Sequence, residues 1–315
     1  MTRMRARIRG RRRVPLLLAG LLAVVGTIAA SPARAEDPLF IPWTQLLPGL
    51  TSEYVPSSAN LCNRGDLRCV DAVIEEMEQR LDPLADRCDH DAVFGLTYLR
   101  TTEEFRRATA TPGFFEDPAF LNHQDAVFAK YYFDAYDNWH AGRTSQVPQA
   151  WKLLFRAADR RQVSAAGNVL LGMSAHVNRD LPYVLEAIGL VKPDGSSRKR
   201  DHDQVDVFLN RVTGPLLAEI ARRFDPSIKG LNAQGTSLDE TTLFQLIALW
   251  REEAWRNAEL LALAPDPVAR AVVVQTIETG AATKGQLLLT ANSYLPPITT
   301  SAARDAFCAA HHNDP

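Results

Sequence analysis

The sequence lacks the short motifs that identify many common enzyme classes. It contains no H-E-x-x-H, no P-loop, no G-x-G-x-x-G and no C-x-x-C. Ser174 stands in G-M-S-A-H, which has no second glycine of the kind that a nucleophile elbow needs. These absences disfavour zincins, kinases, dinucleotide-dependent enzymes and serine hydrolases.

The sequence also lacks sustained alternation of apolar and polar residues with turn pairs, which would indicate antiparallel strands. Apolar residues recur instead with the period of an α-helix. This period predicts helices at about 67–82, 90–108, 118–141, 148–158, 162–189, 202–224, 239–262 and 267–279. We therefore predict an all-α fold, a single disulfide-stapled domain of about eight packed helices over residues 61–315, after an irregular lead at 36–60.

Cysteine is scarce, with four residues in the chain. An even count in an exported protein favours two disulfides over thiolate metal ligands or a nucleophile. Cys69 lies near the start of the predicted 67–82 helix and Cys88 lies beyond its end, so their Cα atoms should lie ~20 Å or more apart. Bridged cysteines need Cα atoms within about 7 Å. The expected pairs are Cys62 with Cys69 and Cys88 with Cys308.

Acidic residues are missing from the first 35 positions, which carry eight arginines. An apolar run at 14–30 and the triplet Ala33-Arg34-Ala35 complete the layout of a secretory signal peptide, so we expect cleavage after Ala35 and a secreted or cell-envelope protein. The pair Arg11-Arg12 leaves the twin-arginine export route open. A retained anchor also stays open, because the run is only slightly shorter than the ~20 residues that span a bilayer.

Cleavage would make the chain strongly acidic. Residues 36–315 hold 27 basic against 37 acidic residues, a net charge of −10 compared with −2 for the whole chain. The one basic cluster is Arg198-Lys199-Arg200, in a Gly/Ser-rich turn. An acidic domain repels phosphate backbones, so we expect no nucleic-acid partner. After cleavage we also expect no stable membrane anchor.

The best candidate for a functional site is the segment L-L-G-M-S-A-H-V-N-R-D-L-P, residues 170–182. His176 and Asp180 are four residues apart, so they share one helix face with the apolar Met173, Val177 and Val184. Buried ionisable groups are destabilising unless they are paired, hydrogen-bonded or bound to a metal. Either a site or a self-satisfied His–Asp hydrogen bond would explain the pattern.

Further histidines and carboxylates lie on neighbouring predicted helices. His202 and Asp206 repeat the four-residue spacing, although an Asp-rich first helical turn exposed to solvent is the alternative interpretation. His140 ends the 118–141 helix, whose apolar stripe more simply indicates core packing. Two or three histidines with carboxylates suffice to bind zinc or another divalent metal.

Three segments carry resemblances to known families. The run G-M-S-A-H-V-N-R-D-L-P, with C-D-H-D-A-V-F-G-L-T-Y-L-R-T-T upstream and R-E-E-A-W-R-N-A downstream, resembles an uncharacterised family of actinobacterial proteins of unknown function over about 66–262. That resemblance implies a helical domain and no particular activity.

A more distant likeness is to the helical zinc phospholipases C and single-strand nucleases, whose metal helix has the pattern H-x-x-x-D-x-x-Q-P-x-H. His176 and Asp180 match its first two ligands, whereas Tyr183 and Val184 replace Gln-Pro and Glu186 replaces the last histidine. Those enzymes also use an N-terminal tryptophan, whereas this chain would begin at Glu36 after cleavage.

Together these observations predict an exported, metal-dependent hydrolase of phosphoester or lipid ester substrates. His140, His176, Asp180 and His202 are the expected metal ligands, and Glu186 and Asp206 are candidates for a further ligand or a general base. The alternative is a non-catalytic exported binding or cell-envelope protein with a structural His–Asp pair. Convergence of the four ligands around an open cavity would favour the enzyme.

Overall fold

A computed structural model describes residues 51–232 and 240–314 of the chain. Contacts divide the chain into Met1–Arg34 and Ala35–Pro315, and every described residue belongs to the second unit. The predicted signal peptide, most of the predicted lead and position 239 of the predicted 239–262 helix therefore lie outside the described residues.

The described residues are organised as helices, which confirms the all-α prediction. In chain order the elements are α1 (Leu67–Asp86), α2 (Asp91–Thr109), α3 (Pro118–His140), η1 (Thr144–Gln146), α4 (Gln149–Asp159), α5 (Ala165–Ser174), η2 (Ala175–Asp180), α6 (Leu181–Ile188), α7 (Lys199–Arg223), η3 (Pro226–Asn232), α8 (Glu240–Ala262), α9 (Pro267–Asn292) and α10 (Ala302–His311). Extended pairing within 51–232 and 240–314 is limited to two isolated bridges.

Two helices begin where Asp-Pro pairs predict that they should. The side chain of Asp117 accepts a hydrogen bond from Phe120 N (3.1 Å), and that of Asp266 accepts one from Ala269 N (2.8 Å). Each carboxylate thus satisfies an amide at the start of α3 or α9 that has no partner within the helix. Proline at the first helical position needs no such partner.

Three helix predictions need correction. The helix predicted to end near 279 continues as α9 to Asn292, because Val274, Ile277, Ala281 and Gly285 extend one buried face past Gly280. The first helix passes through Pro83 and ends at Asp86. The last helix, α10, was not predicted because its ten residues bury only Arg304 and Cys308.

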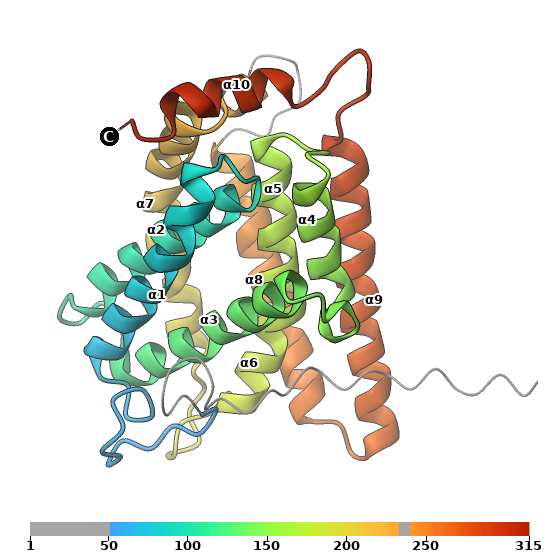
Figure 1. Cartoon of the computed structure of the whole chain (residues 1–315). Helices are drawn as coiled ribbons and strands as arrows, with labels where there is room; N and C mark the ends of the chain where they lie inside the picture. The colour runs from blue at the N-terminus through green and yellow to red at the C-terminus, as the bar shows by residue number, and fades with distance from the viewer. Residues whose placement is uncertain (1–50, 233–239, 315) are drawn as a thin grey trace, which may run out of the picture. The chain divides into compact units, whose positions relative to one another are not determined.

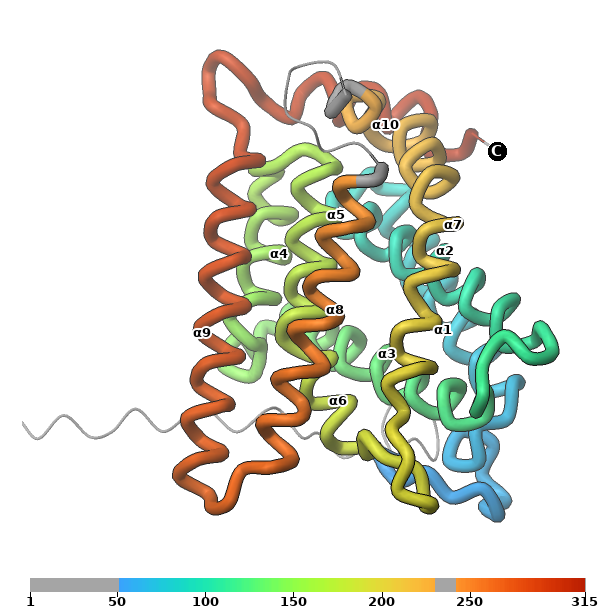
Figure 2. Tube along the Cα trace, turned by 180° about the vertical axis from the view of Figure 1, so that it is seen from behind, coloured from blue at the N-terminus to red at the C-terminus, as the bar shows by residue number. Residues whose placement is uncertain are grey.

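Two groups of helices flank the centre of the unit (Figure 1). One group contains α1, α2, α3 and α7; the other contains α4, α5, α6 and α9, and α8 lies behind the centre in this view. Figure 2 shows the reverse side, with α8 between α7 and the α5–α9 pair. In both views α10 crosses one end, close to α7.

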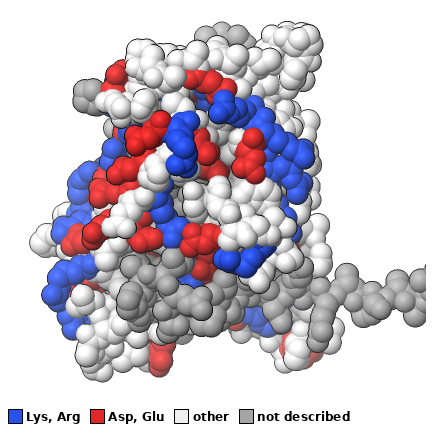
Figure 3. Space-filling view, in the orientation of Figure 1, with Lys and Arg blue, Asp and Glu red and all other residues white. Residues whose placement is uncertain are grey.

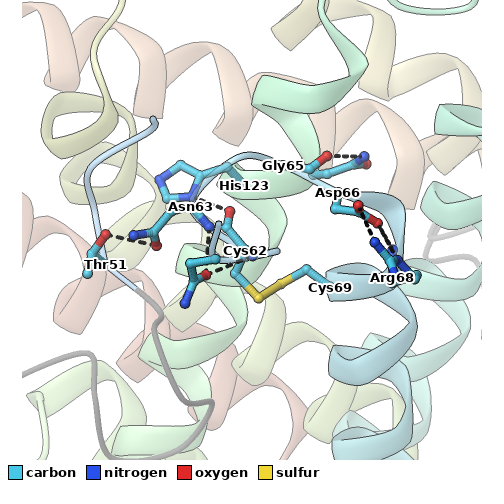
Figure 4. Close-up of a disulfide and its surroundings, with 10 residues drawn as sticks. Thr51, Cys62, Asn63, Gly65, Asp66, Arg68, Cys69 and His123 are labelled. Carbon is cyan, nitrogen blue, oxygen red and sulfur yellow. Dashed lines mark hydrogen bonds and ion pairs between the residues drawn. A yellow bond between two sulfur atoms is a disulfide. The ribbon is translucent and has the colours of Figure 1, made fainter. Parts of the chain in front are cut away.

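The Cys62–Cys69 disulfide closes the loop before α1 (Figure 4), with Cα atoms 5.1 Å apart. His123 Nδ1 donates a hydrogen bond to the carbonyl of Cys62 (2.9 Å), and Asn122 Nδ2 donates one to Gly65 O (2.9 Å). The loop is thereby bound to α3. This disulfide is one of the two that the spacing predicts.

The second predicted disulfide, Cys88–Cys308, joins α10 to the start of α2, with Cα atoms 5.9 Å apart. Beside it, buried Arg304 donates to His90 Nδ1 (3.0 Å), Asn168 Oδ1 (2.7 Å) and the carbonyl of Val163 (2.9 Å). His90 Nε2 in turn donates to Asp305 Oδ1 (2.9 Å). Two disulfides indicate that the protein folds in an oxidising compartment.

The apolar interior consists of three clusters. The largest, cluster A, includes residues of each helix from α1 through α5, among them Phe94, Tyr132 and Trp151. Cluster B joins α2, α7 and α8 through residues such as Phe105, Phe208 and Ile247. Cluster C joins η2 and α6 to α8 through residues such as Val177, Leu181 and Trp250.

The face in Figure 3 carries acidic and basic side chains interspersed with one another. Many charged side chains of the described residues form ion pairs, as Arg80 does with Asp137 (2.5 Å) and Arg100 with Glu219 (2.8 Å). Within the described part of the chain, no helix is both long and apolar enough to cross a membrane.

Candidate functional site

A cavity of about 100 Å³ lies between α2, α3, α5, η2, α6, α7 and α8. It forms where clusters A, B and C meet, because side chains from seven elements converge there without filling the space. Its apolar lining consists mainly of Phe94, Phe105, Leu121, Phe128, Met173, Val177, Leu181, Val205, Phe208, Leu209 and Ile247. Concave, mainly apolar space with a few polar groups is typical of small-molecule sites.

The chain bulges where it passes this cavity. The predicted 162–189 helix is observed as α5, η2 and α6, and η2 has the wide turn of a π-helix. Leu181 N donates to the carbonyl of His176, five residues earlier, while Pro182 has no amide proton to donate. Single π-helical turns inside α-helices occur frequently at functional sites.

Asp180 is fully buried at the end of this turn, and three donors converge on its carboxylate. Its Oδ2 accepts from His176 Nδ1 (3.0 Å) and Trp151 Nε1 (2.9 Å), and its Oδ1 accepts from Arg179 Nη1 (2.9 Å). A carboxylate only accepts, so Nδ1 of His176 must carry a proton. The neutral imidazole therefore has its free lone pair on Nε2.

His176 Nε2 is buried and has no hydrogen-bond partner among the described residues. Its ring lines the cavity, stacked on Phe128 with centroids 3.5 Å apart and edge-on to Tyr98 at 4.6 Å. Burial lowers the pKa of His176, against the opposing effect of the Asp180 hydrogen bond. The imidazole is thus neutral at pH 7 and able to accept a proton.

Three further polar groups of the cavity lining lack a partner within residues 51–232 and 240–314. They are the hydroxyls of Tyr98 and Thr102 and Oδ2 of Asp125. Burial raises the pKa of Asp125 to about 8, so its carboxyl group is protonated at neutral pH. Burial, then the nearby Asp125, raises the pKa of Tyr98 well above its usual value.

Arg251 is the cation in the cavity lining, but its guanidinium is already engaged. Its Nε donates to Asp206 Oδ1 (2.6 Å), and its Nη2 donates to the carbonyl of His202. The cavity is therefore largely neutral at pH 7. Its unpartnered polar groups are a neutral base, a protonated carboxyl group and two hydroxyl groups.

The structure brings His176 and Asp180 together but places the other two predicted ligands elsewhere. His140 Nε2 lies 3.2 Å from Asp91 Oδ2 near the end of α3. His202 Nε2 donates to the carbonyl of Arg251 (3.1 Å), beside Trp255. Four-ligand convergence, on which the metal prediction depended, is thus not observed for these residues.

The two predicted catalytic carboxylates also have other partners. Glu186 pairs with Arg270 (3.1 Å), and Asp206 pairs with Arg251 (2.6 Å). Among the described residues, no group of three or more His, Cys, Asp or Glu side chains is placed to hold a metal ion. Asp180 already accepts three hydrogen bonds, one of them from cationic Arg179. Zinc binding stays a prediction that metal analysis tests.

Sequence reasoning did not select Tyr98, Thr102 or Asp125 as site residues. Asp125 nevertheless carried a signal, because it follows Leu121 by four residues and precedes Phe128 by three on the apolar stripe of α3. Tyr98 and Thr102 occupy the same kind of position between Phe94 and Phe105 on α2. Polar residues on a core-facing stripe are the pattern that identifies this site.

One comparison with known proteins gives a match. The model of a family described as "Family of unknown function (DUF5995)" matches residues 70–291, more than half of the chain. No curated protein and no solved structure matches the chain. The likeness to zinc phospholipases C and single-strand nucleases stays a prediction.

Proposed function

The chain belongs to the DUF5995 family of unknown function, and we propose from its site that it binds a small, largely apolar molecule in the central cavity. His176 would act there as a general base. The observation that carries this proposal is the buried, unpartnered Nε2 of His176 in the cavity lining. Asp180 would hold the ring and stabilise the imidazolium that forms when Nε2 takes up a proton.

A purely structural His–Asp pair explains fewer of the contacts. Trp151 and Arg179 already donate to Asp180, so the carboxylate does not depend on His176 alone for its hydrogen bonds. A buried polar atom without a partner costs about 1–3 kcal/mol, and four such atoms belong to residues that line this one cavity. A ligand or enclosed water that pairs with these atoms would remove that cost.

Hydrolysis of a carboxylic ester is the narrower function that we propose. His176 would take a proton from water as the water attacks the ester carbonyl, and would return it to the departing alkoxide. Tyr98 and protonated Asp125 would donate to the carbonyl oxygen, and Thr102 carries a third unpartnered hydroxyl group in the lining. A phosphoester is disfavoured, because its charge would enter a cavity whose lining cation is already paired.

We also propose that the protein is exported and loses residues 1–35. The two disulfides support this proposal, because such bonds form and persist in oxidising compartments. N-terminal sequencing of exported protein should begin at Glu36. An intact Met1 in the membrane fraction would contradict the proposal and indicate an anchor.

Calorimetric titration with toluene tests whether the cavity binds a ligand. Wild-type protein should bind toluene saturably, whereas Val177→Phe, which fills the cavity from its lining, should abolish binding and keep the helical circular-dichroism spectrum. The matched control is Val207→Phe on α7, where the side chain is exposed. Absence of binding to the wild type, or equal binding to Val177→Phe, would overturn the proposal.

Hydrolysis is tested with p-nitrophenyl acetate and p-nitrophenyl phosphate, with zinc and with a chelator. We expect cleavage of the acetate alone, independent of zinc, and a loss of at least about 10²-fold in His176→Gln. Zinc-dependent cleavage of the phosphate would support the metal-dependent hydrolase instead. Toluene binding without cleavage of either ester would leave a non-catalytic binding protein.

A further inference from the structure

The unpartnered groups around the cavity have an unequal balance of donors and acceptors. Tyr98, Thr102 and protonated Asp125 each carry a hydroxyl proton that no described residue accepts. His176 Nε2 is the one group of the four that only accepts. A ligand with an acceptor oxygen would therefore satisfy more of these groups than a ligand with only a donor.

Charge on the ligand would be unfavourable in this space. The titratable and charged groups around Asp125 are Tyr98 on α2, His176 on η2 and Arg251 on α8; the residues that α7 contributes to the lining are apolar. At pH 7 the first two are neutral, and Arg251 is paired with Asp206. An anion would lack a free cation here, and a cation would lack a free carboxylate.

We infer that the natural ligand is a neutral, largely apolar carbonyl compound whose oxygen accepts hydrogen bonds from the Asp125 carboxyl and the Tyr98 hydroxyl. This inference rests on the proposed function and names the ligand class of the same cavity. Asp125 and Tyr98 are then binding groups for the carbonyl oxygen, and His176 Nε2 stays free as the base. Ketones and carboxylic esters both belong to this class.

Two probes of nearly the same shape separate oxygen recognition from apolar burial. Acetophenone carries a carbonyl oxygen where α-methylstyrene carries a methylene group, and neither titrates between pH 6 and 9. At pH 6 wild-type protein should bind acetophenone at least about tenfold more tightly, as expected for two net hydrogen bonds. Above about pH 8 most of this preference should be lost, because ionised Asp125 cannot donate and the Tyr98 hydroxyl is then the remaining donor.

Three variants assign the preference to its residues. Asp125→Asn keeps an N–H donor, so the preference should persist and become independent of pH. Asp125→Leu should remove most of the preference while still binding α-methylstyrene, and Tyr98→Phe should remove part of it. Asp203→Asn, at an exposed position on α7, is the control and should behave as wild type.

Each outcome has one meaning. If neither probe binds, the proposed function fails and this inference fails with it. If both probes bind equally, or if Asp125→Leu keeps the full preference, the cavity is a binding site but the inference about its ligand is wrong. A preference that does not change between pH 6 and 9 in wild-type protein would also overturn the role of the Asp125 carboxyl group.

Discussion

Asp180 is the residue on which the geometry of the site depends most. Its carboxylate joins Trp151 of α4, Arg179 and His176, and it is fully buried. Arg179 extends the network to Glu278 of α9 (2.9 Å). The orientation of the imidazole therefore depends on three helical segments, and its tautomer depends on one acceptor atom.

Replacement of Asp180 by Asn should be strongly destabilising. An amide offers one acceptor oxygen for three donors and leaves the Arg179 charge with one carboxylate fewer, so we expect a loss of about 3–5 kcal/mol in the free energy of unfolding. Denaturant titration measures the loss. Asp203→Asn, an exposed partner of Lys199, should change the free energy of unfolding by less than about 1 kcal/mol. Equal effects of the two changes would contradict this account.

At the scale of single elements, close approaches of the backbone determine how the helices meet. A Cβ atom at Gly172 of α5 would lie 2.1 Å from the ring of Phe94 on α2, which lines the cavity. At Gly65, before α1, a Cβ atom would lie 1.7 Å from the carbonyl oxygen of Ala119 on α3. Glycine is required at both positions for lack of space, and at Gly65 also by a φ of +71°.

Gly65→Ala should therefore destabilise the protein much more than a positive φ alone would. We expect a loss of about 3 kcal/mol or more, because the carbonyl that it meets is backbone and cannot rotate away. Gly113→Ala is the matched control, with a φ of +74° and no atom within 4 Å of the added Cβ. It should cost only about 1–2 kcal/mol. Thermal unfolding of the two variants would contradict the expectation if their melting temperatures coincided.

The same scale explains how far the sequence could predict this fold and site. Apolar periodicity and Asp-Pro pairs indicate the helices because both are local signals, and cysteine spacing was enough to assign both disulfides. The His176–Asp180 pair was predictable for the same reason. The role of Asp125 was not, because its surroundings come from α2, η2 and α8, far away in the sequence. The spacing of His140 and His202 likewise gave no information about their distance in space.

At the scale of the whole unit, α10 fastens the C-terminal part to the start of α2 through a buried polar network. His90 accepts from Arg304 and donates to Asp305, so it must stay neutral. Burial, followed by the positive charge of Arg304, lowers the pKa of His90 to about 4. In the unfolded chain the pKa of this residue would be about 6.5.

Stability should consequently fall as the pH falls from about 6.5 to about 4. In this range the unfolded chain binds a proton that the folded protein excludes from His90, so unfolding becomes more favourable by roughly 3 kcal/mol at most. His90→Gln supplies a donor and an acceptor without titrating. On acidification the free energy of unfolding of wild type should therefore fall further than that of His90→Gln. A difference between the two proteins that is independent of pH would show that His90 does not titrate in this way.

The most direct test of the proposed site is a long-range ¹H–¹⁵N NMR spectrum of the His176 ring, recorded with and without a saturating cavity ligand such as acetophenone. We expect a proton on Nδ1, none on Nε2 and a pKa below 6.5 for His176 in the free protein. We also expect that the ligand shifts the Nε2 resonance while the His140 and His202 resonances stay in place. A proton on Nε2 at pH 7, or an Nε2 resonance that does not respond to the bound ligand, would contradict the proposed site.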